Sequence, residues 1–393
     1  MRTVILDGAR TPIGKFGGGL SSLTASQLGG IAIKEALNRS GVKPEEVGEV
    51  IMGSVLQGGQ GQLPSRQASR NAGLPWEVKT ELINKVCASG MRSVTLGDQF
   101  IRLGEEEVIV AGGMESMSQS PYIMPKARFG FRMGDAAVKD LMLHDGLTCS
   151  FTGGHMGTYG NGTAEEFNLS REDQDRWALR SHERAVASKS VLEEEIVPVE
   201  IPQKRGAVLT VAQDESPRAD TSYDKLAKLN PVFGADGTIT AGNAPGVNDG
   251  AAALVLMSEE RASKEGRTPL AYIVGHTALA IEAKDFPKTP GLVINKLLEK
   301  TGKSVDEIDL FEINEAFAAV TLASKQIAGL DEEKINVNGG AVALGHPIGA
   351  SGTRIILTLA YELKRRGGGI GIAAICSGGG QGDAIMIEVP KAK

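Results

Sequence analysis

Cysteine is scarce in this chain of 393 residues, which contains Cys87, Cys149 and Cys376 and no others. No two of them form a CxxC pair, so neither a disulfide framework nor a zinc site is expected, and no metal site is predicted. Isolated thiols suit a reducing compartment, and the first ten residues are typical of a strand and a turn rather than of a signal peptide. We therefore expect the protein in the cytoplasm.

Excess positive charge and long apolar runs are also missing. The formal net charge is −6, so the chain lacks the basic character that a nucleic-acid partner needs. No apolar run approaches the roughly 18 residues of a membrane span, which argues against a membrane partner. No GxGxxG motif follows a strand in the setting of a dinucleotide site. With 41% hydrophobic residues, the composition is that of a soluble globular protein of two or three domains.

Short apolar segments alternate along the chain with segments of helical periodicity. Strands are predicted at 3–7, 50–54, 80–86, 108–112, 271–277, 308–313 and 370–375. Helices are predicted at 25–40, 88–103, 290–301, 316–328 and 353–366. This alternation predicts an α/β fold in which mostly buried sheets lie between helices in a layered sandwich.

The chain also contains an internal duplication. The pattern ASGxR occurs at 88–92 and again at 350–354, an offset of 262 residues. Segments 40–47 and 301–308 match at an offset of 261 residues. Two matches in the same order at nearly one offset indicate two homologous halves.

The halves differ by one large insertion. In the second half the short segment 376–382 separates the last two predicted strands, whereas about 137 residues intervene in the first half. The insertion contains a helix that starts with a capping box at Ser170 and runs to about residue 189. Its segments 151–162 and 230–249 are rich in glycine and proline and only weakly periodic. The predicted division is 1–112 with 250–269 for the first half, 113–249 for the insertion, and 270–393 for the second half.

One histidine stands in the densest glycine cluster of the sequence. His346 lies in NVNGGAVALGHPIGASG, where Pro347 fixes φ and a predicted helix follows. Turns of this kind aim a side chain or a row of backbone N–H groups at a ligand. An incidental histidine in a buried turn is the alternative, although the chain has only five histidines.

Two of the cysteines lie where a strand ends. Cys87 directly precedes a predicted helix, whose dipole would lower the pKa of the thiol and favour the thiolate. A small buried cysteine without a chemical role is the alternative. Cys376 is followed by SGGGQG, whose backbone N–H groups are free to bind an oxyanion. Residues without such a setting are expected to be structural, namely Cys149, His144, His182 and His276.

Asn314 follows a further predicted strand, where it either orients a water molecule or caps the helix predicted from residue 316. His155, in GGHMG of the insertion, is a possible lid contact. Two thiols, one histidine and glycine-lined turns together indicate covalent acyl chemistry, in which one cysteine accepts the acyl group and a histidine deprotonates it. The second thiol can act as acid and base. Spacing alone does not name the substrate.

The chain resembles the thiolases along nearly its whole length. The motifs that carry the resemblance are RTPIGKFGG, NKVCASGMRSV, AGGMESMS, TAGNAPGVNDGAA, NEAFA, NGGAVALGHPIGASG and CSGGGQGDA. The resemblance implies the thiolase fold, in which two duplicated α/β core domains each have a sheet with flanking helices and the first carries an inserted loop domain. It also implies coenzyme A binding and oligomer contacts through that loop domain, and a homo-oligomer that is commonly a tetramer.

The resemblance also assigns roles to individual residues. Cys87 matches the acylated nucleophile, His346 the base that activates it, and Cys376 the base that removes a proton from the second acetyl-CoA. Asn314 matches the residue that holds a water in one oxyanion hole, and the N–H groups of Cys87 and Gly378 match the other. The implied reaction converts two acetyl-CoA reversibly to acetoacetyl-CoA and CoA. Coenzyme A esters would be substrates, with no permanently bound cofactor.

Contacts to coenzyme A are implied by position. The candidates are Arg218 and Lys225 for the nucleotide end, and Ala241, Val247 and Phe317 for the pantetheine tunnel. His155-Met156 resembles the HM pair of short-chain biosynthetic thiolases, where the methionine limits the acyl pocket. Many relatives read AGNASG where this chain reads AGNAPG, and Pro245 cannot supply the serine hydroxyl near pantetheine.

Three alternatives stay open beside a short-chain acetyltransferase. The first is a degradative 3-ketoacyl-CoA thiolase of broader chain length, which a wide pocket beside Met156 would favour. The second is a ketoacyl synthase, whose Cys-His-His site the SGGG turn after Cys376 speaks against. The third is a non-catalytic protein that binds CoA esters or lipids on the same fold.

Overall fold

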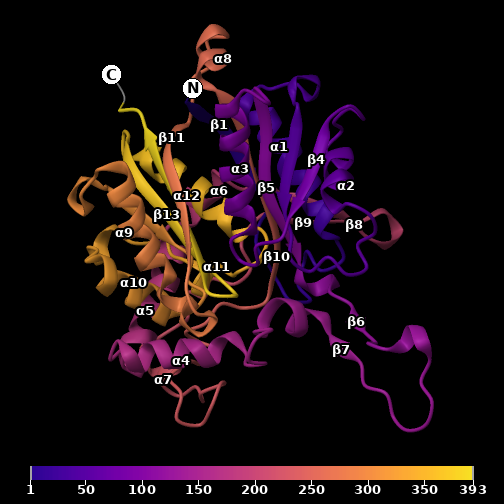
Figure 1. The fold of residues 1–393 in the computed structure, drawn as a ribbon, viewed down its shortest axis with the longest axis vertical. Coiled ribbons are helices and arrows are strands. Elements are labelled where there is room, and N and C mark those ends of the chain that lie inside the picture. The colour runs from indigo at the N-terminus through magenta and orange to yellow at the C-terminus, as the bar shows by residue number, and fades with distance from the viewer. Residues whose placement is uncertain (1, 392–393) are drawn as a thin grey trace.

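A computed structural model describes residues 2–391 of the chain, and its centre is one large mixed sheet (Figure 1). The strand order is β12-β13-β14-β11-β1-β10-β5-β3-β4, and the two-residue β2 (Gly14–Lys15) pairs with β10. The first half supplies β1 (Thr3–Arg10), β3 (Glu49–Gly53), β4 (Lys79–Ile83), β5 (Val108–Ser116) and β10 (Asn248–Ser258). The second half supplies β11 (Ala271–Ala280), β12 (Leu310–Ile313), β13 (Gly369–Ser377) and β14 (Gln381–Val389).

The duplication is visible in the strand order. From the centre outwards, the first half runs β1-β10-β5-β3 and the second half runs β11-β14-β13-β12. In each half the first three strands are antiparallel and the last pair is parallel. A parallel bridge between Phe311 and Ile335 occupies the place that β4 has in the first half.

The two half-sheets are joined, whereas the sequence predicted a sheet for each core half. Strands β1 and β11 pair over two residues, Val4 with Tyr272 and Ile5 with Ala271. Each of these strands would otherwise be an unpaired edge, and their short pairing satisfies backbone groups that an edge leaves open.

Helices cover the two faces of the sheet and fill the space between its halves. They are α1 (Ala25–Ser40), α2 (Pro64–Asn71), α3 (Ser89–Leu103), α8 (Glu259–Lys264), α9 (Thr289–Thr301), α10 (Ala318–Ala328), α11 (Ala341–Leu344) and α12 (Ser351–Arg365). One core cluster unites α1 and α2 with the first half-sheet, another unites α9 and α10 with the second, and a third places α3 and α12 between the half-sheets. The predicted layered sandwich is therefore present.

Local signals explain why several elements begin and end where the sequence predicts. Thr24 caps α1 in a capping box with Gln27, and Gly41 ends the helix with a left-handed φ of 66°. Strand β3 alternates between two cores, because Val50 and Met52 belong to the outer cluster and Ile51 to the central one.

Among the predicted boundaries that differ from the structure, two lie near the candidate site. The strand predicted at 80–86 ends at Ile83, and the chain then enters a turn in which Val86 has a φ of 47°. The helix predicted from residue 316 begins at Ala318, with Phe317 at its N-cap position. In the first place the chain leaves the strand earlier than predicted, and in the second it enters the helix later, so that an irregular turn is longer in both.

Most of the insertion lies at one end of the sheet, at the bottom of Figure 1, whereas its segment 199–211 lies beside the first half-sheet. It contains β6 (Tyr122–Ile123), β7 (Lys139–Asp140), a π-helical turn η4 (Met142–Leu147), α4 (Met156–Glu166), α5 (Arg171–Ala187), α6 (Lys189–Glu193), β8 (Val199–Pro202), β9 (Val208–Val211) and α7 (Tyr223–Ala227). The predicted capping box of α5 is present, with Ser170 accepting from the N–H of Asp173. A β6–β7 arm projects away from the body.

Helix α4 was missed because its glycines hide a helical pattern. A Cβ at Gly157 would lie 2.1 Å from the Phe233 ring, and one at Gly160 would lie 2.3 Å from Ile239. Glycine is therefore present for close packing rather than for a turn. His155 caps the helix, because its Nδ1 accepts from the N–H of Gly157 at 3.1 Å.

A buried charge cluster fixes the insertion to the sheet. Arg10 of β1 is 1% exposed and binds Glu195 at 2.6 Å and Asp214 at 2.7 Å. Removing any one partner would leave an uncompensated buried charge. None of the helices within residues 2–391 combines the length and the hydrophobicity that a membrane span requires.

Candidate active site

The nucleophile candidate sits in a tight turn between β4 and α3. Ser89 Oγ donates to the carbonyl of Val86 at 2.6 Å and accepts from the N–H of Lys85 at 2.8 Å. From the second half, Ser377 Oγ donates to the carbonyl of Lys85 at 2.6 Å. These bonds hold the half-buried Cys87 at the end of a strand, where sites in α/β folds commonly form.

The thiol of Cys87 is neutral in this environment. Burial is the main cause that raises its pKa to about 12; the N–H groups of Gly378 and of Cys87 itself oppose this shift, and the charge of Glu115 adds to it. The predicted lowering by the helix is therefore wrong, because loss of hydration outweighs the dipole at this position. The two N–H groups point at the sulfur, which places them near any acyl group bound there.

The base candidate lies on a rigid turn that leads into α12. His346 Nδ1 lies 2.6 Å from Ser351 Oγ, which itself donates to the carbonyl of Pro347 at 3.0 Å. Since that hydroxyl proton is already used, Ser351 accepts from Nδ1–H, and Nε2 carries the free lone pair. Asn314 Nδ2, a hydrogen-bond donor, lies 3.4 Å from His346 Nε2. Burial, together with the Arg354 charge, lowers the pKa of His346 to about 3.

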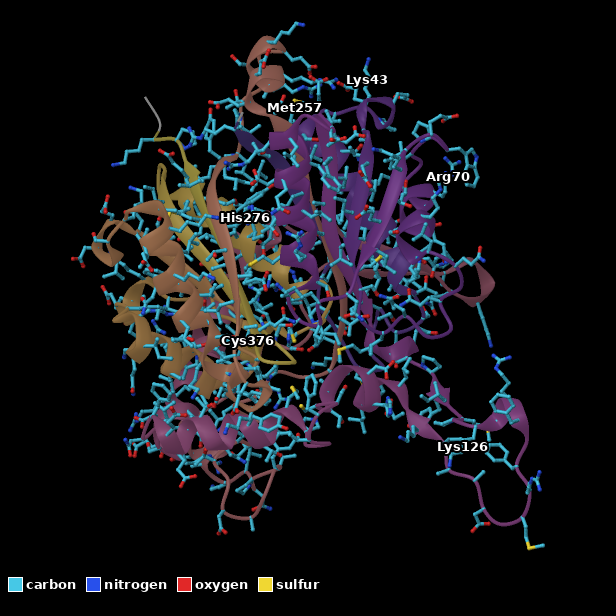
Figure 2. The ribbon with its side chains drawn as sticks, in the orientation of Figure 1. Lys43, Arg70, Lys126, Met257, His276 and Cys376 are labelled. Carbon is cyan, nitrogen blue, oxygen red and sulfur yellow. The ribbon has the colours of Figure 1, made fainter. Side chains whose placement is uncertain are left out.

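Cys376 and Asn314 lie next to the reactive groups, Cys376 beside Cys87 and Asn314 beside His346. Cys376, at the end of β13, is fully buried, and burial raises its pKa well above the ordinary range, with Cys87 as the second cause. Asn314 is also fully buried, and its Oδ1 has no hydrogen-bond partner within the described residues. The alternative of Asn314 as a helix cap is wrong, because α10 begins four residues later. Figure 2 shows Cys376 at the end of the sheet that faces α4, well away from His276.

Cys87, His346 and Gly378 face one inner cavity of about 330 Å³. The sequence-predicted His155, Met156, Val247 and Phe317 also line it, together with Pro245. Its other lining residues are Val86, Met117, Met142, Leu143, Gly146, Leu147, Val232, Phe233, Ala244, Gly246, Phe286, Ala316 and Ile348. Apart from the reactive groups and His155 the wall is apolar, which suits an acyl chain and a thioester arm rather than a charged ligand.

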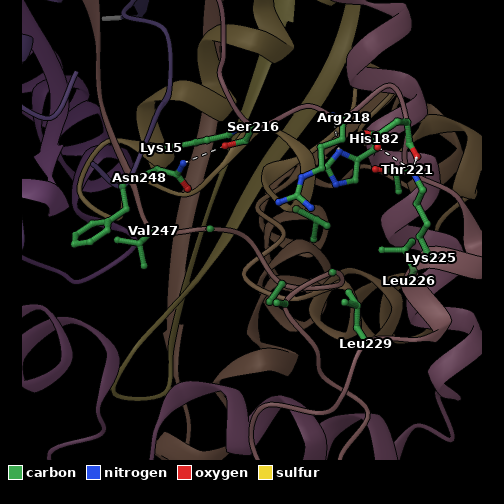
Figure 3. Close-up of a pocket in the computed structure, with 17 residues that line it drawn as sticks. Lys15, His182, Ser216, Arg218, Thr221, Lys225, Leu226, Leu229, Val247 and Asn248 are labelled. Carbon is green, nitrogen blue, oxygen red and sulfur yellow. Dashed lines mark hydrogen bonds and ion pairs between the residues drawn. The ribbon is translucent and has the colours of Figure 1, made fainter. Parts of the chain in front are cut away.

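An outer cavity of about 360 Å³ adjoins the inner one, because Ala244, Gly246 and Val247 line both. Its wall is more polar, and Figure 3 shows Arg218, His182 and Lys225 on one side facing Lys15 and Ser216 on the other. The predicted Arg218, Lys225 and Ala241 are all part of this wall. Lys225 is bound to Asp220 at 2.8 Å, so its charge is already partly compensated.

His182 was interpreted as structural, yet it lines the outer cavity. Its Nδ1 accepts from the N–H of Arg218 at 3.2 Å, and burial, followed by the Arg218 charge, lowers its pKa to about 4. The residue lies on α5, far along the chain from the other lining segments, and no local motif marks it. Lys15 was missed as well, although it lies within the conspicuous RTPIGKFGG segment.

The other residues expected to be structural lie outside both cavities. His144 pairs with Asp145 at the surface, and His276 lies 3.1 Å from Asp98 at the seam between the halves. Among the described residues, no group of three or more His, Cys, Asp or Glu side chains could hold a metal ion.

Comparisons with known proteins cover the whole chain. The model of the thiolase N-terminal domain matches residues 3–260, and that of the thiolase C-terminal domain matches residues 267–389. The chain is 47% identical over 392 residues to an acetyl-CoA acetyltransferase of Chromobacterium violaceum, covering 99% of this chain and all of that protein. It is 44% identical to a probable acetyl-CoA acyltransferase of Staphylococcus epidermidis, covering 98% of each.

The fold is also similar to a solved structure. The crystal structure of the Bacillus anthracis acetyl-CoA acetyltransferase superposes with a TM-score of 0.97 at 43% sequence identity, and 99% of each chain is covered.

Proposed function

This chain belongs to the thiolase family, and on that premise we propose that it is an acetyl-CoA acetyltransferase that condenses two acetyl-CoA to acetoacetyl-CoA and CoA, reversibly. The observation that carries the proposal is the inner cavity, whose wall contains Cys87, a neutral His346 and the N–H groups of Gly378 and Cys87 that lie by the Cys87 sulfur. Coenzyme A esters are its substrates, and no resident cofactor is needed.

Acylation begins from a neutral pair. His346 Nε2 takes the proton of the Cys87 thiol as the sulfur attacks the thioester carbonyl. The N–H groups of Cys87 and Gly378 receive the negative charge that develops on the carbonyl oxygen. Cys376 then protonates the departing CoA sulfur, which leaves acetyl-Cys87, an imidazolium at His346 and a thiolate at Cys376.

Condensation returns the site to its starting state. The Cys376 thiolate, a strong base because burial raises the pKa of that thiol, removes a proton from the α-carbon of the second acetyl-CoA. Asn314, whose Oδ1 is unpartnered within the described residues, holds a water that stabilises the enolate oxygen. The carbanion attacks acetyl-Cys87, and the His346 imidazolium protonates the released Cys87 sulfur.

The two cavities divide coenzyme A between them. The thioester and pantetheine arm occupy the apolar inner cavity, while the phosphates lie in the outer cavity near Arg218 and Lys15. Pro245 contributes only apolar surface to this path, because proline has neither a side-chain hydroxyl nor an N–H.

The second candidate function is that of a thiolase that accepts a broader range of acyl chain lengths. The shape of the inner cavity supports this alternative. The wall beside Met156 is apolar, and Leu143 and Val232, which also line the cavity, are 44% and 55% exposed. A longer acyl chain could follow this surface outwards, whereas Met156 beside the reactive groups favours a short acyl chain.

We also propose a cytoplasmic homotetramer. The β6–β7 arm carries Phe129 and Met133, which are 91% and 99% exposed, and such apolar side chains are expected to pack against another copy. Deleting residues 124–138 should reduce the particle mass measured by light scattering. An unchanged mass would contradict a role of the arm in assembly. All three thiols are free, which suits a reducing cytoplasm.

Mass spectrometry of the intact protein after brief exposure to acetoacetyl-CoA tests the function. One added acetyl group on the wild type, absent from Cys87→Ser, is expected. Thiolysis rates for a series of 3-ketoacyl-CoA esters then separate the two candidates, since a steep fall with chain length supports the short-chain enzyme. No adduct, with CoA esters still bound, would refute the enzyme and favour a binding protein.

A further inference from the structure

The candidate nucleophile and its base come from different halves of the chain. Cys87 belongs to the first half, and the turn that carries His346, residues 345–349, belongs to the second. A small displacement of one half against the other would separate the two groups, and acyl transfer needs them within hydrogen-bond reach. Something must therefore set their separation.

Two buried side chains of the first half bind the backbone of the His346 turn. Asn248 Oδ1 accepts from the N–H of His346 at 2.9 Å, and Glu115 Oε2 accepts from the N–H of Gly349 at 2.9 Å. Both side chains are fully buried and lie at the ends of neighbouring strands, β10 and β5.

Asn248 is itself held in place. Its Nδ2 donates to the carbonyl of Gly14 at 2.9 Å and to Ser216 Oγ at 3.3 Å, a bond drawn in Figure 3. Its amide packs so closely on the turn that a Cβ at Gly345 would lie 2.5 Å from Asn248 Cγ. Neither end of this amide can move without breaking a buried hydrogen bond.

Glu115 continues towards the nucleophile. Its Oε2 also accepts from the N–H of Val55 at 3.0 Å. The carbonyl of Val55 accepts from Asn84 Nδ2 at 3.4 Å, and Asn84 Oδ1 accepts from the N–H of Val86 at 3.0 Å. Hydrogen bonds, linked through the backbone of Val55 and the side-chain amide of Asn84, thus connect the base turn to the residue that precedes Cys87.

We propose that Asn248 and Glu115 form a clamp across the two halves that sets the position of His346 relative to Cys87. Both are positioning residues, since they act through the backbone of the turn and touch no reacting atom. This inference rests on the proposed function, because the clamp positions the residue that acts as the base in that function. It adds two residues of the first half that hold a base of the second.

Asn248→Ala tests the clamp, with Asn338→Ala as the matched control. Asn338 is also a buried asparagine, and its Nδ2 donates a hydrogen bond to Glu362 Oε2 at 2.9 Å. It makes no hydrogen bond to the His346 turn. We expect Asn248→Ala to lower kcat at least about tenfold with KM for acetoacetyl-CoA changed less than about threefold. Asn338→Ala should change kcat less than about twofold, at equal loss of thermal stability.

A double-mutant cycle with His346→Ala distinguishes loss of the position of His346 from a general disturbance of the structure. Once the imidazole is gone, Asn248→Ala should cost less than about twofold in kcat. Equal losses in both backgrounds would overturn the clamp. Glu115→Gln provides a second variant should Asn248→Ala not fold, because Gln keeps the shape but loses one acceptor oxygen, and it should show the same dependence on His346.

The same double-mutant cycle can be measured without substrate, as the rate at which iodoacetamide alkylates Cys87 at pH 8. The rate should fall in Asn248→Ala and in His346→Ala, and no further in the double variant. A rate that is unchanged in Asn248→Ala would overturn the clamp. Absence of acetyl transfer in the wild type would overturn only the proposed function, since the alkylation cycle remains readable.

Discussion

Ser351→Ala tests whether the tautomer of His346 matters for acylation. The Ser351 hydroxyl accepts from His346 Nδ1–H at 2.6 Å and thereby leaves Nε2 unprotonated to receive the proton of Cys87. In the variant, a buried N–H loses its partner, which costs about 1–3 kcal/mol. Alternatively the proton moves to Nε2, where it meets the N–H₂ group of Asn314 and where the imidazole no longer serves as a base.

Either response should slow the formation of acetyl-Cys87. At 1.4 kcal/mol per factor of ten, about 1–3 kcal/mol corresponds to roughly 5- to 150-fold. The loss should be independent of pH between about 5 and 9, because the pKa of His346 is lowered to about 3 and the imidazole stays neutral throughout that range. A single-turnover measurement of acetyl-enzyme formation follows this step alone.

Ser324→Ala is the matched control for that measurement. Ser324 is fully buried and donates to the carbonyl of Val320 at 2.7 Å within α10, outside the wall of either cavity. The substitution Ser324→Ala removes a buried hydroxyl that does not contact His346. The acylation rate of this variant should therefore stay within about twofold of the wild type. A wild-type rate in Ser351→Ala, or an equal loss in Ser324→Ala, would refute the role given to the Ser351 hydrogen bond.

Three further predictions follow from the same geometry. Because burial raises the pKa of Cys87 to about 12, its alkylation rate in His346→Ala, where no imidazole accepts the proton, should rise about tenfold per pH unit from pH 7 to 9, and a plateau in that range would contradict a neutral thiol. Arg218→Ala should raise KM for CoA esters several-fold with little change in kcat, and Lys225→Ala should do less because Asp220 already pairs with Lys225; equal effects would contradict this ranking. Met156→Ala should widen the inner cavity and raise thiolysis of longer 3-ketoacyl-CoA esters relative to acetoacetyl-CoA, and an unchanged ratio would exclude Met156 as the limit.

The outline of the fold could be predicted because the alternation of strands and helices occurs in both halves of the sequence. Helix α1 shows its capping residue, its apolar spacing and its terminal glycine in one short segment, and it forms where the sequence predicts. The join between β1 and β11 could not be predicted, because it rests on a two-residue pairing between segments some 270 residues apart. Nothing in either segment marks which edge the other will meet.

The site was predictable where a residue type and its local setting coincide. Cys87, His346 and Gly378 reach one cavity from three turns, of which those of His346 and Gly378 stand out by their glycines and that of Cys87 by the helix that follows it. The pKa of Cys87 was predicted with the wrong sign, because a helix start is visible in the sequence and the depth of burial is not. His182 gave no signal, since it occupies an ordinary helical position on α5 and acquires a cavity only when the insertion folds back.

The duplication explains both what the sequence reveals and what it conceals about the chemistry. At the offset of 262 residues, Cys87 of the first half corresponds to Gly349 of the second, so one turn carries the thiol and its counterpart presents only backbone groups. Glu115 accepts from the N–H of Gly349, while Ser377, at the corresponding end of β13, binds the carbonyl of Lys85 in the nucleophile turn. Each half therefore holds the turn of the other by a side chain at one strand end. A pairwise arrangement of this kind leaves no local motif, yet it places a base from one half beside a nucleophile from the other.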